Sequence, residues 1–167
     1  MSDYAPLPPS VRDALTRIEP SRDGDRLIFP CRATLADGSI VNHVCLVPAA
    51  QFAKVWEMAP SIYRDNRSIG AEDLAAIEES PDRLPARFAN EIYKQGESGM
   101  GYTIFTVVFK DGSRQVYATG GRVDFIPYPE GKGPSDVVSV IPHEGRHDPS
   151  LLGAPESLWC LFAEDPI

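Results

Sequence analysis

Two copies of the tripeptide Asp-Gly-Ser limit the folds open to this chain more than any other feature of its sequence. They stand at 37–39 and 111–113, 74 residues apart, and each lies between segments with the patterns of β-strands. Asp-Gly readily adopts the positive φ angles of a tight turn between antiparallel strands. The sequence therefore predicts two β-hairpins, at 26–47 and 102–119, within one sheet. A duplication and the convergent chemistry of hairpin tips account equally well for the repeat.

Apolar residues at helical spacing predict short helices around these hairpins. The first follows Ser10, which we expect to cap it, and the last begins at Pro85 and ends at Gly96. In the third, Leu74 and Ile77 supply the apolar positions. Two further β-branched or apolar runs predict late strands. The expected helices lie at residues 10–18, 49–58, 71–79 and 85–95. We expect a strand at 137–141 and a late strand or docked segment at 157–163.

The length and composition fit one globular α+β domain. The chain has 167 residues, 43% of them hydrophobic and 24% charged, which is enough to bury a core without disulfides or metals. We expect a single domain over residues 1–167, with a largely antiparallel sheet of five to seven strands and short helices on one face. Residues 1–9 are rich in proline, and we expect them to be a loosely ordered lead.

The net charge of −8 comes from 24 Asp and Glu against 16 Lys and Arg. No run of basic residues alternates with aromatic ones, so the charge argues against nucleic-acid binding and favours a basic protein as a partner. Solubility alone is the simpler interpretation of the charge. The N-terminus lacks the pattern of a signal peptide and no segment is apolar enough to span a bilayer, so we expect a cytoplasmic protein without membrane contact.

Three cysteines, Cys31, Cys45 and Cys160, are an odd number without close spacing. This argues against a disulfide framework and against a cysteine-based zinc site. Cys31 and Cys160 stand among apolar residues, and we expect both to be small core residues.

Residues 143–147 spell H-E-x-x-H, the pattern in which two histidines bind zinc and the glutamate polarises a zinc-bound water. His143 and His147 would be the ligands and Glu144 the base. A peptidase holds this pattern on a buried helix, whereas here prolines flank the segment and a glycine interrupts it. We therefore expect a polar loop and no cofactor, and we keep a zinc-dependent hydrolase as an alternative.

The glycine-rich segment 96–101 contains Ser98 and invites comparison with a nucleophile elbow or a phosphate loop. It matches neither pattern, because Met100 stands where the elbow needs glycine and no Lys-Ser or Lys-Thr follows. We interpret it as a flexible connection. A small-ligand pocket beside this loop remains a further alternative.

Five acidic residues cluster around the helix expected at 71–79. Acids are favoured near the N-terminus of a helix but not near its C-terminus, so the later ones need another explanation. We interpret the cluster as a binding face for a basic partner, with a solvated helix face as the simpler alternative. A polar loop at 63–67 with one tyrosine is a weaker candidate for binding. The five acids are Glu72, Asp73, Glu78, Glu79 and Asp82.

Together these observations favour a non-enzymatic module that binds another macromolecule, of the inhibitor, immunity or adaptor type. The zinc-dependent hydrolase and the small-ligand-binding domain are the alternatives. The sequence leaves the oligomeric state open.

Overall fold

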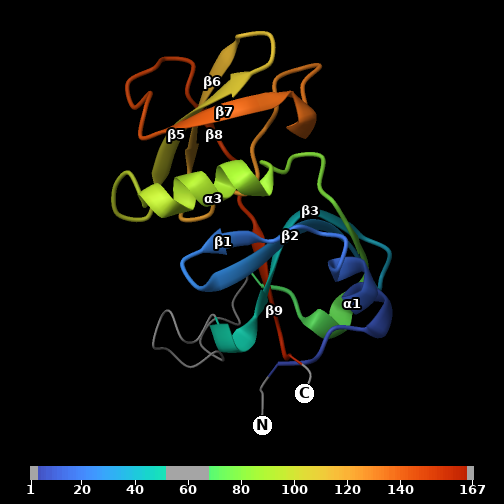
Figure 1. Cartoon of the computed structure of the whole chain (residues 1–167). Coiled ribbons are helices and arrows are strands. Elements are labelled where there is room, and N and C mark those ends of the chain that lie inside the picture. The colour runs from blue at the N-terminus through green and yellow to red at the C-terminus, as the bar shows by residue number, and fades with distance from the viewer. Residues whose placement is uncertain (1–3, 52–67, 165–167) are drawn as a thin grey trace. The chain divides into compact units, whose positions relative to one another are not determined.

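The computed structural model describes residues 4–51 and 68–164. Helices and strands are mixed within these residues, so the predicted α+β class is confirmed (Figure 1). The strands form two sheets, each built on one Asp-Gly-Ser hairpin, rather than the single sheet that we predicted. Among the described helices, none is long and apolar enough to cross a membrane.

The chain divides into two compact units. Unit 1 comprises residues 1–20, 25–80 and 157–167, and unit 2 comprises residues 21–24 and 81–156. The expectation of one domain stays a prediction, because compact units of one chain can still unfold in a single cooperative transition.

Unit 1 contains the first predicted hairpin, formed by β2 (Arg26–Leu35) and β3 (Ile40–Pro48). β4 (Leu74–Glu78) pairs antiparallel with β2, and β9 (Leu158–Phe162) pairs parallel with β3. Helix α1 (Pro9–Leu15) packs against β4. It begins one residue before Ser10, which therefore does not cap it, because two prolines already fix the backbone of its first turn.

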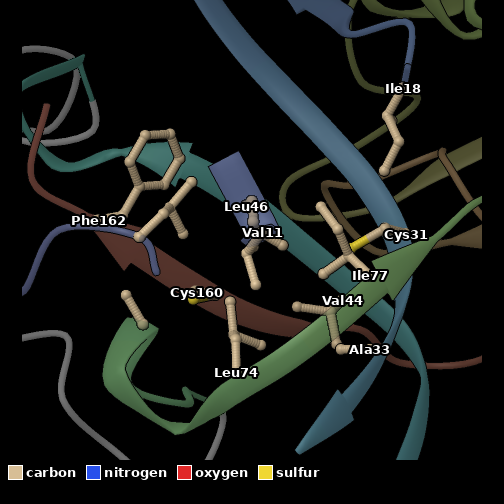
Figure 2. Packing of buried hydrophobic residues seen from close by; sticks show 12 residues of the cluster. Val11, Ile18, Cys31, Ala33, Val44, Leu46, Leu74, Ile77, Cys160 and Phe162 are labelled. Atoms are coloured by element: carbon tan, nitrogen blue, oxygen red, sulfur yellow. The ribbon is translucent and has the colours of Figure 1, made fainter. Parts of the chain in front are cut away.

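The core of unit 1 lies between α1 and this sheet. Figure 2 shows Leu74 and Ile77 on β4 together with Val11 of α1 and with Cys31 and Cys160 of the sheet, all buried in one cluster. The prediction that Cys31 and Cys160 are core residues is confirmed. Cys45 is buried as well, and none of the three cysteines forms a disulfide.

Residues 71–79 do not form the predicted helix. Residues Ala71–Asp73 make one turn of 3-10 helix, η2, and the chain then continues as β4. The prediction was wrong because Leu74 and Ile77 are three residues apart, a spacing typical of a helix face.

A β-bulge produces this spacing in a strand. Leu35 of β2 pairs with Leu74, whereas the preceding residue, Thr34, pairs with Ala76. The extra residue of β4 shifts the alternation of side chains by one position. Leu74 and Ile77 therefore reach the same face of the sheet although they are an odd number of residues apart.

The helix expected at 49–58 falls partly within the described residues. Residues 49–51 are helical, and the rest of that helix lies outside the described residues, as does the polar loop at 63–67.

Unit 2 contains the second predicted hairpin, formed by β5 (Thr103–Phe109) and β6 (Arg114–Thr119). β7 (Val137–Pro142) pairs antiparallel with β5, and β8 (Leu152–Gly153) pairs parallel with β6. Helix α3 (Ala86–Gln95) packs against β7. β1 (Ser21–Asp23) also contacts α3 and belongs to this unit. The predicted helix at 85–95 and strand at 137–141 are confirmed.

The two units repeat the same order of elements. In each, a helix precedes an Asp-Gly-Ser hairpin, and a 3-10 turn then leads into a bulged strand that pairs with the first hairpin strand. In unit 2 the turn is η3 (Pro134–Asp136), and the bulge lies between the pairs Phe109 with Val137 and Val108 with Ser139. The bulge therefore occupies the same position in β7 as in β4.

Several residues match between the units at equivalent places. In each hairpin turn an Asp Oδ1 accepts hydrogen bonds from the Ser backbone N at 2.9 Å and from the Ser Oγ at 2.5 Å. Before each bulged strand stands the pattern Gly-x-x-Asp, followed by an apolar residue and another three positions later. The matched residues are Asp37 and Asp111, Gly38 and Gly112, Ser39 and Ser113, Gly70 and Gly133, Asp73 and Asp136, Leu74 and Val137, and Ile77 and Val140.

Candidate functional site

The five predicted acidic residues do not share one helix face. Glu72 and Asp73 are exposed on η2, and Glu78 and Glu79 are exposed at the end of β4. Asp82 lies in unit 2, where its backbone carbonyl accepts a hydrogen bond from the amide of Ile126 at 2.9 Å. Four of the acids therefore belong to unit 1 and the fifth to unit 2.

Burial along this segment repeats every three residues. Ala71, Leu74, Ile77 and Ser80 are buried, and the residues between them are exposed. This pattern leaves the four acids of this segment exposed to solvent. One of them, Glu78, lies 3.7 Å from the guanidinium of Arg32 on the neighbouring strand. Such an exposed ion pair stabilises a fold by less than about 1 kcal/mol.

The acidic excess of the chain belongs mainly to unit 1. This unit carries 13 Asp and Glu against 7 Lys and Arg, a net charge of −6. Unit 2 carries 11 against 9, a net charge of −2. The electrostatic field that a charged partner meets is therefore strongest around unit 1.

The repeated architecture shows which acids the fold uses. Asp73 has an acidic counterpart in unit 2, Asp136, whose carboxylate accepts a hydrogen bond from the amide of Gly133 at 2.8 Å and so closes the 3-10 turn. The other acids have no acidic counterpart. Serine stands in place of Glu72, isoleucine in place of Glu78 and proline in place of Glu79.

The H-E-x-x-H segment is a turn that follows β7, not a helix. His143 has φ 65°, and it is the one non-glycine residue with positive φ among residues 4–51 and 68–164. Its amide donates to the carbonyl of Ile104 at 2.7 Å. The side chain of Glu144 lies 3.4 Å from Arg114, and His147 is exposed. The polar loop that we predicted is confirmed.

Both ring nitrogens of His143 are engaged. Nδ1 lies 2.7 Å from the Oγ of Ser98, and Nε2 lies 3.2 Å from the carbonyl oxygen of Gln95. A zinc ion would have to displace one of these partners, because it binds the lone pair of a ring nitrogen. In the part of the chain that the structure describes, no three His, Cys, Asp or Glu gather closely enough to hold a metal ion. The zinc-dependent hydrolase stays an untested alternative.

The hydrogen bonds of His143 define its tautomer. A carbonyl oxygen can only accept, so Nε2 carries the hydrogen that it donates to Gln95. In the neutral ring Nδ1 then holds the lone pair and accepts the hydrogen of Ser98 Oγ, for which the carbonyl oxygen of Ile104, at 3.3 Å, is a second and more distant acceptor. The Oγ also accepts a hydrogen bond from the amide of Ile104 at 2.8 Å.

Arg146 completes a cluster around Ser98. Its guanidinium donates to the hydroxyl of Tyr102 at 2.7 Å and to the backbone carbonyl of Ser98 at 3.0 Å, and it stacks over the Tyr102 ring at 5.5 Å. Gly99 lies beneath that ring, where a Cβ would come within 2.2 Å of it. These contacts connect loop 96–102 to Arg146, and the flexibility that we expected of segment 96–101 stays a prediction.

Sequence patterns gave no sign of this cluster. Ser98 and His143 were both singled out, but for different motifs, and they are 45 positions apart. Arg146 stands at an unspecified position of the H-E-x-x-H pattern, and Tyr102 follows the glycine-rich segment. The two loops meet because α3 and β7 end close to the start of β5, a consequence of sheet topology that no local pattern encodes.

No protein-family model, no curated protein and no solved structure matches this chain.

Proposed function

We propose that this chain is a binding module that recognises a basic protein through the acidic edge of unit 1. The acidic edge is the exposed set Glu72, Glu78 and Glu79 around β4. This agrees with an inhibitor, immunity or adaptor role, in which affinity for a partner is the activity.

The comparison between the units carries this proposal. The 3-10 turn and bulged strand form in unit 2 with serine, isoleucine and proline at the positions of these glutamates. The shared architecture therefore does not require the three acids. Residues that a fold does not require, and that remain exposed and alike in charge, are candidates for recognition of a partner.

Acids on an outer strand also discourage pairing with other chains, which is an alternative reason for their presence. Among the described strands, β4 pairs only with β2, and β7 pairs only with β5. β7 nevertheless lacks acids at the matching positions, and its exposed Val138 is apolar. Protection of the strand is thus a weaker explanation than recognition.

Capture of a partner by matched charge variants tests the proposal. The variant E78K/E79K reverses two charges of the acidic edge, whereas E130K/E156K makes the same change in net charge at exposed positions of unit 2. Each immobilised chain is exposed to a lysate, and retained proteins are identified by mass spectrometry. We expect a basic protein to be retained by the wild type and by E130K/E156K but lost with E78K/E79K. Equal retention by all three chains would contradict the proposal.

A further inference from the structure

We propose that Ser98 and His143 form a nucleophile and general base that transfer acyl groups from esters. This site lies wholly in unit 2 and shares no residue with the acidic edge of unit 1. It goes beyond the binding role, and either can fail without the other.

The geometry meets the main requirement of nucleophilic catalysis by serine. The Oγ of Ser98 and the Nδ1 of His143 are 2.7 Å apart, within the range at which a base removes the hydroxyl proton. The base is itself oriented by a third group, the carbonyl of Gln95 at 3.2 Å from Nε2. Because that carbonyl holds the hydrogen on Nε2, the basic lone pair of the ring faces the serine.

One backbone amide beside Ser98 favours a negative charge on its oxygen. The Ile104 amide donates to Oγ at 2.8 Å and would stabilise an alkoxide as it forms. The hydroxyl hydrogen has two acceptors within reach, Nδ1 of His143 at 2.7 Å and the carbonyl oxygen of Ile104 at 3.3 Å, and the shorter distance favours His143. One lone pair of Oγ remains for attack, because the other accepts the hydrogen bond from the Ile104 amide. The Arg146 guanidinium, 3.0 Å from the carbonyl oxygen of Ser98, places a positive charge beside the site. We regard Arg146 as a positioning residue, because its two guanidinium nitrogens donate to Tyr102 and to the backbone of Ser98, within loop 96–102.

The repeated architecture has no counterpart of the Ser98 and His143 pair in unit 1. His143 follows the last residue of β7, and its counterpart after β4 is Ser80, which is buried. The counterpart of Ser98, at the same distance before the Asp-Gly-Ser turn, is Gly24. The pair is therefore not needed by the shared architecture. His143 also sits at φ 65°, a conformation costing about 1 kcal/mol or more for a residue with a side chain, and such strain concentrates at functional sites.

The reaction balances without a cofactor. Ser98 Oγ attacks the carbonyl carbon of an ester while its proton passes to Nδ1 of His143. The bond between that carbon and the alkoxy oxygen breaks, and the leaving alkoxide takes the proton from the imidazolium. Water then attacks the acyl-serine, gives its proton to Nδ1, and the acid is released as the proton returns to Ser98.

A serine-directed fluorophosphonate probe tests the proposal on the full chain. We expect stoichiometric labelling that maps to Ser98 by mass spectrometry and a burst of nitrophenol from p-nitrophenyl acetate. S98A should abolish both, while S139A, which alters an exposed serine of the same unit, should leave both unchanged. H143A should slow labelling by about 100-fold or more, the usual contribution of a general base. Circular dichroism establishes that each variant is folded.

Added imidazole distinguishes a base from a structural link. If His143 acts as a base, imidazole in solution should restore a large part of the labelling rate of H143A. The absence of labelling in the folded wild type would overturn the proposal. Labelling of S98A at the wild-type rate would also overturn it. Labelling of H143A at close to the wild-type rate would do the same.

Discussion

Asp73 and Asp136 occupy the same place in the two units, at the end of a 3-10 turn and the start of a bulged strand. The carbonyl of Asp73 accepts a hydrogen bond from Ala36 N at 2.8 Å, and the carbonyl of Asp136 accepts one from Lys110 N at 2.8 Å. In each case the donor immediately precedes the Asp-Gly-Ser turn. This match makes each unit a control for the other, because a residue present in only one of them serves something other than the common architecture.

Gly145 offers a test of the loop that carries His143. It has φ 105°, and a Cβ there would lie 2.4 Å from Cγ1 of Val116. We expect G145A to lower the free energy of unfolding by about 2 kcal/mol or more, because strained backbone and a steric clash add. Gly131 has φ 79° but open space around it, so G131A should cost only the backbone part, about 1 kcal/mol. Urea denaturation measures the free energy of unfolding of each variant. Equal decreases in G145A and G131A would show that the contact with Val116 does not contribute.

The ion pair of Arg122 and Asp23 should stabilise unit 2. The two groups are 2.6 Å apart, their side chains are 15% and 30% exposed, and the guanidinium also lies over the ring of Tyr93 at 4.9 Å. R122M leaves a shielded carboxylate without this partner, and we expect a loss on the order of 3 kcal/mol. R114M is the control, because its ion pair with Glu144 is exposed and should contribute less than about 1 kcal/mol. Similar denaturation midpoints for the two variants would contradict this prediction.

The buried thiols give a prediction about pH. Burial, with a smaller effect from the charges of Glu72 and Asp73, raises the pKa of Cys160 to about 12. In the unfolded chain a thiol ionises near its ordinary value, about 8.5, so its contribution to stability is complete below that pH and is lost as pH rises toward 12. We expect the native chain to resist iodoacetamide at about pH 8 and to react at all three cysteines once unfolded. Rapid alkylation of Cys160 in the native chain would show that it is accessible.

The sequence was sufficient to predict the elements whose patterns are local. The Asp-Gly turns carry their own conformational preference, and α3 has both an initiating proline and a terminating glycine. β4 could not be recognised in this way, because the bulge gives Leu74 and Ile77 the spacing of a helix. The signal that would have corrected this was the second copy of Gly-x-x-Asp, before Val137, in a segment correctly predicted as a strand.

The residues of the candidate sites could be chosen from the sequence, but their surroundings could not. Glu72, Glu78 and Glu79 were found from charge alone, but placed on a helix that does not exist. His143 was found from a zinc motif, and the structure gives it Ser98 as a partner instead. Such a contact depends on where two loops end in a folded sheet, so it follows from tertiary topology rather than from any run of residues.

The rate of association with the captured basic partner tests the central claim most directly. Exposed charges accelerate encounter through long-range attraction, and salt screens this attraction. At low ionic strength we expect E78K/E79K to reduce the association rate constant by about 10-fold or more and to flatten its salt dependence. E130K/E156K, with the same net charge, should change it much less. Surface plasmon resonance measures these rates. Equal rates for the wild type and E78K/E79K, or an equal reduction by both variants, would contradict recognition through the acidic edge.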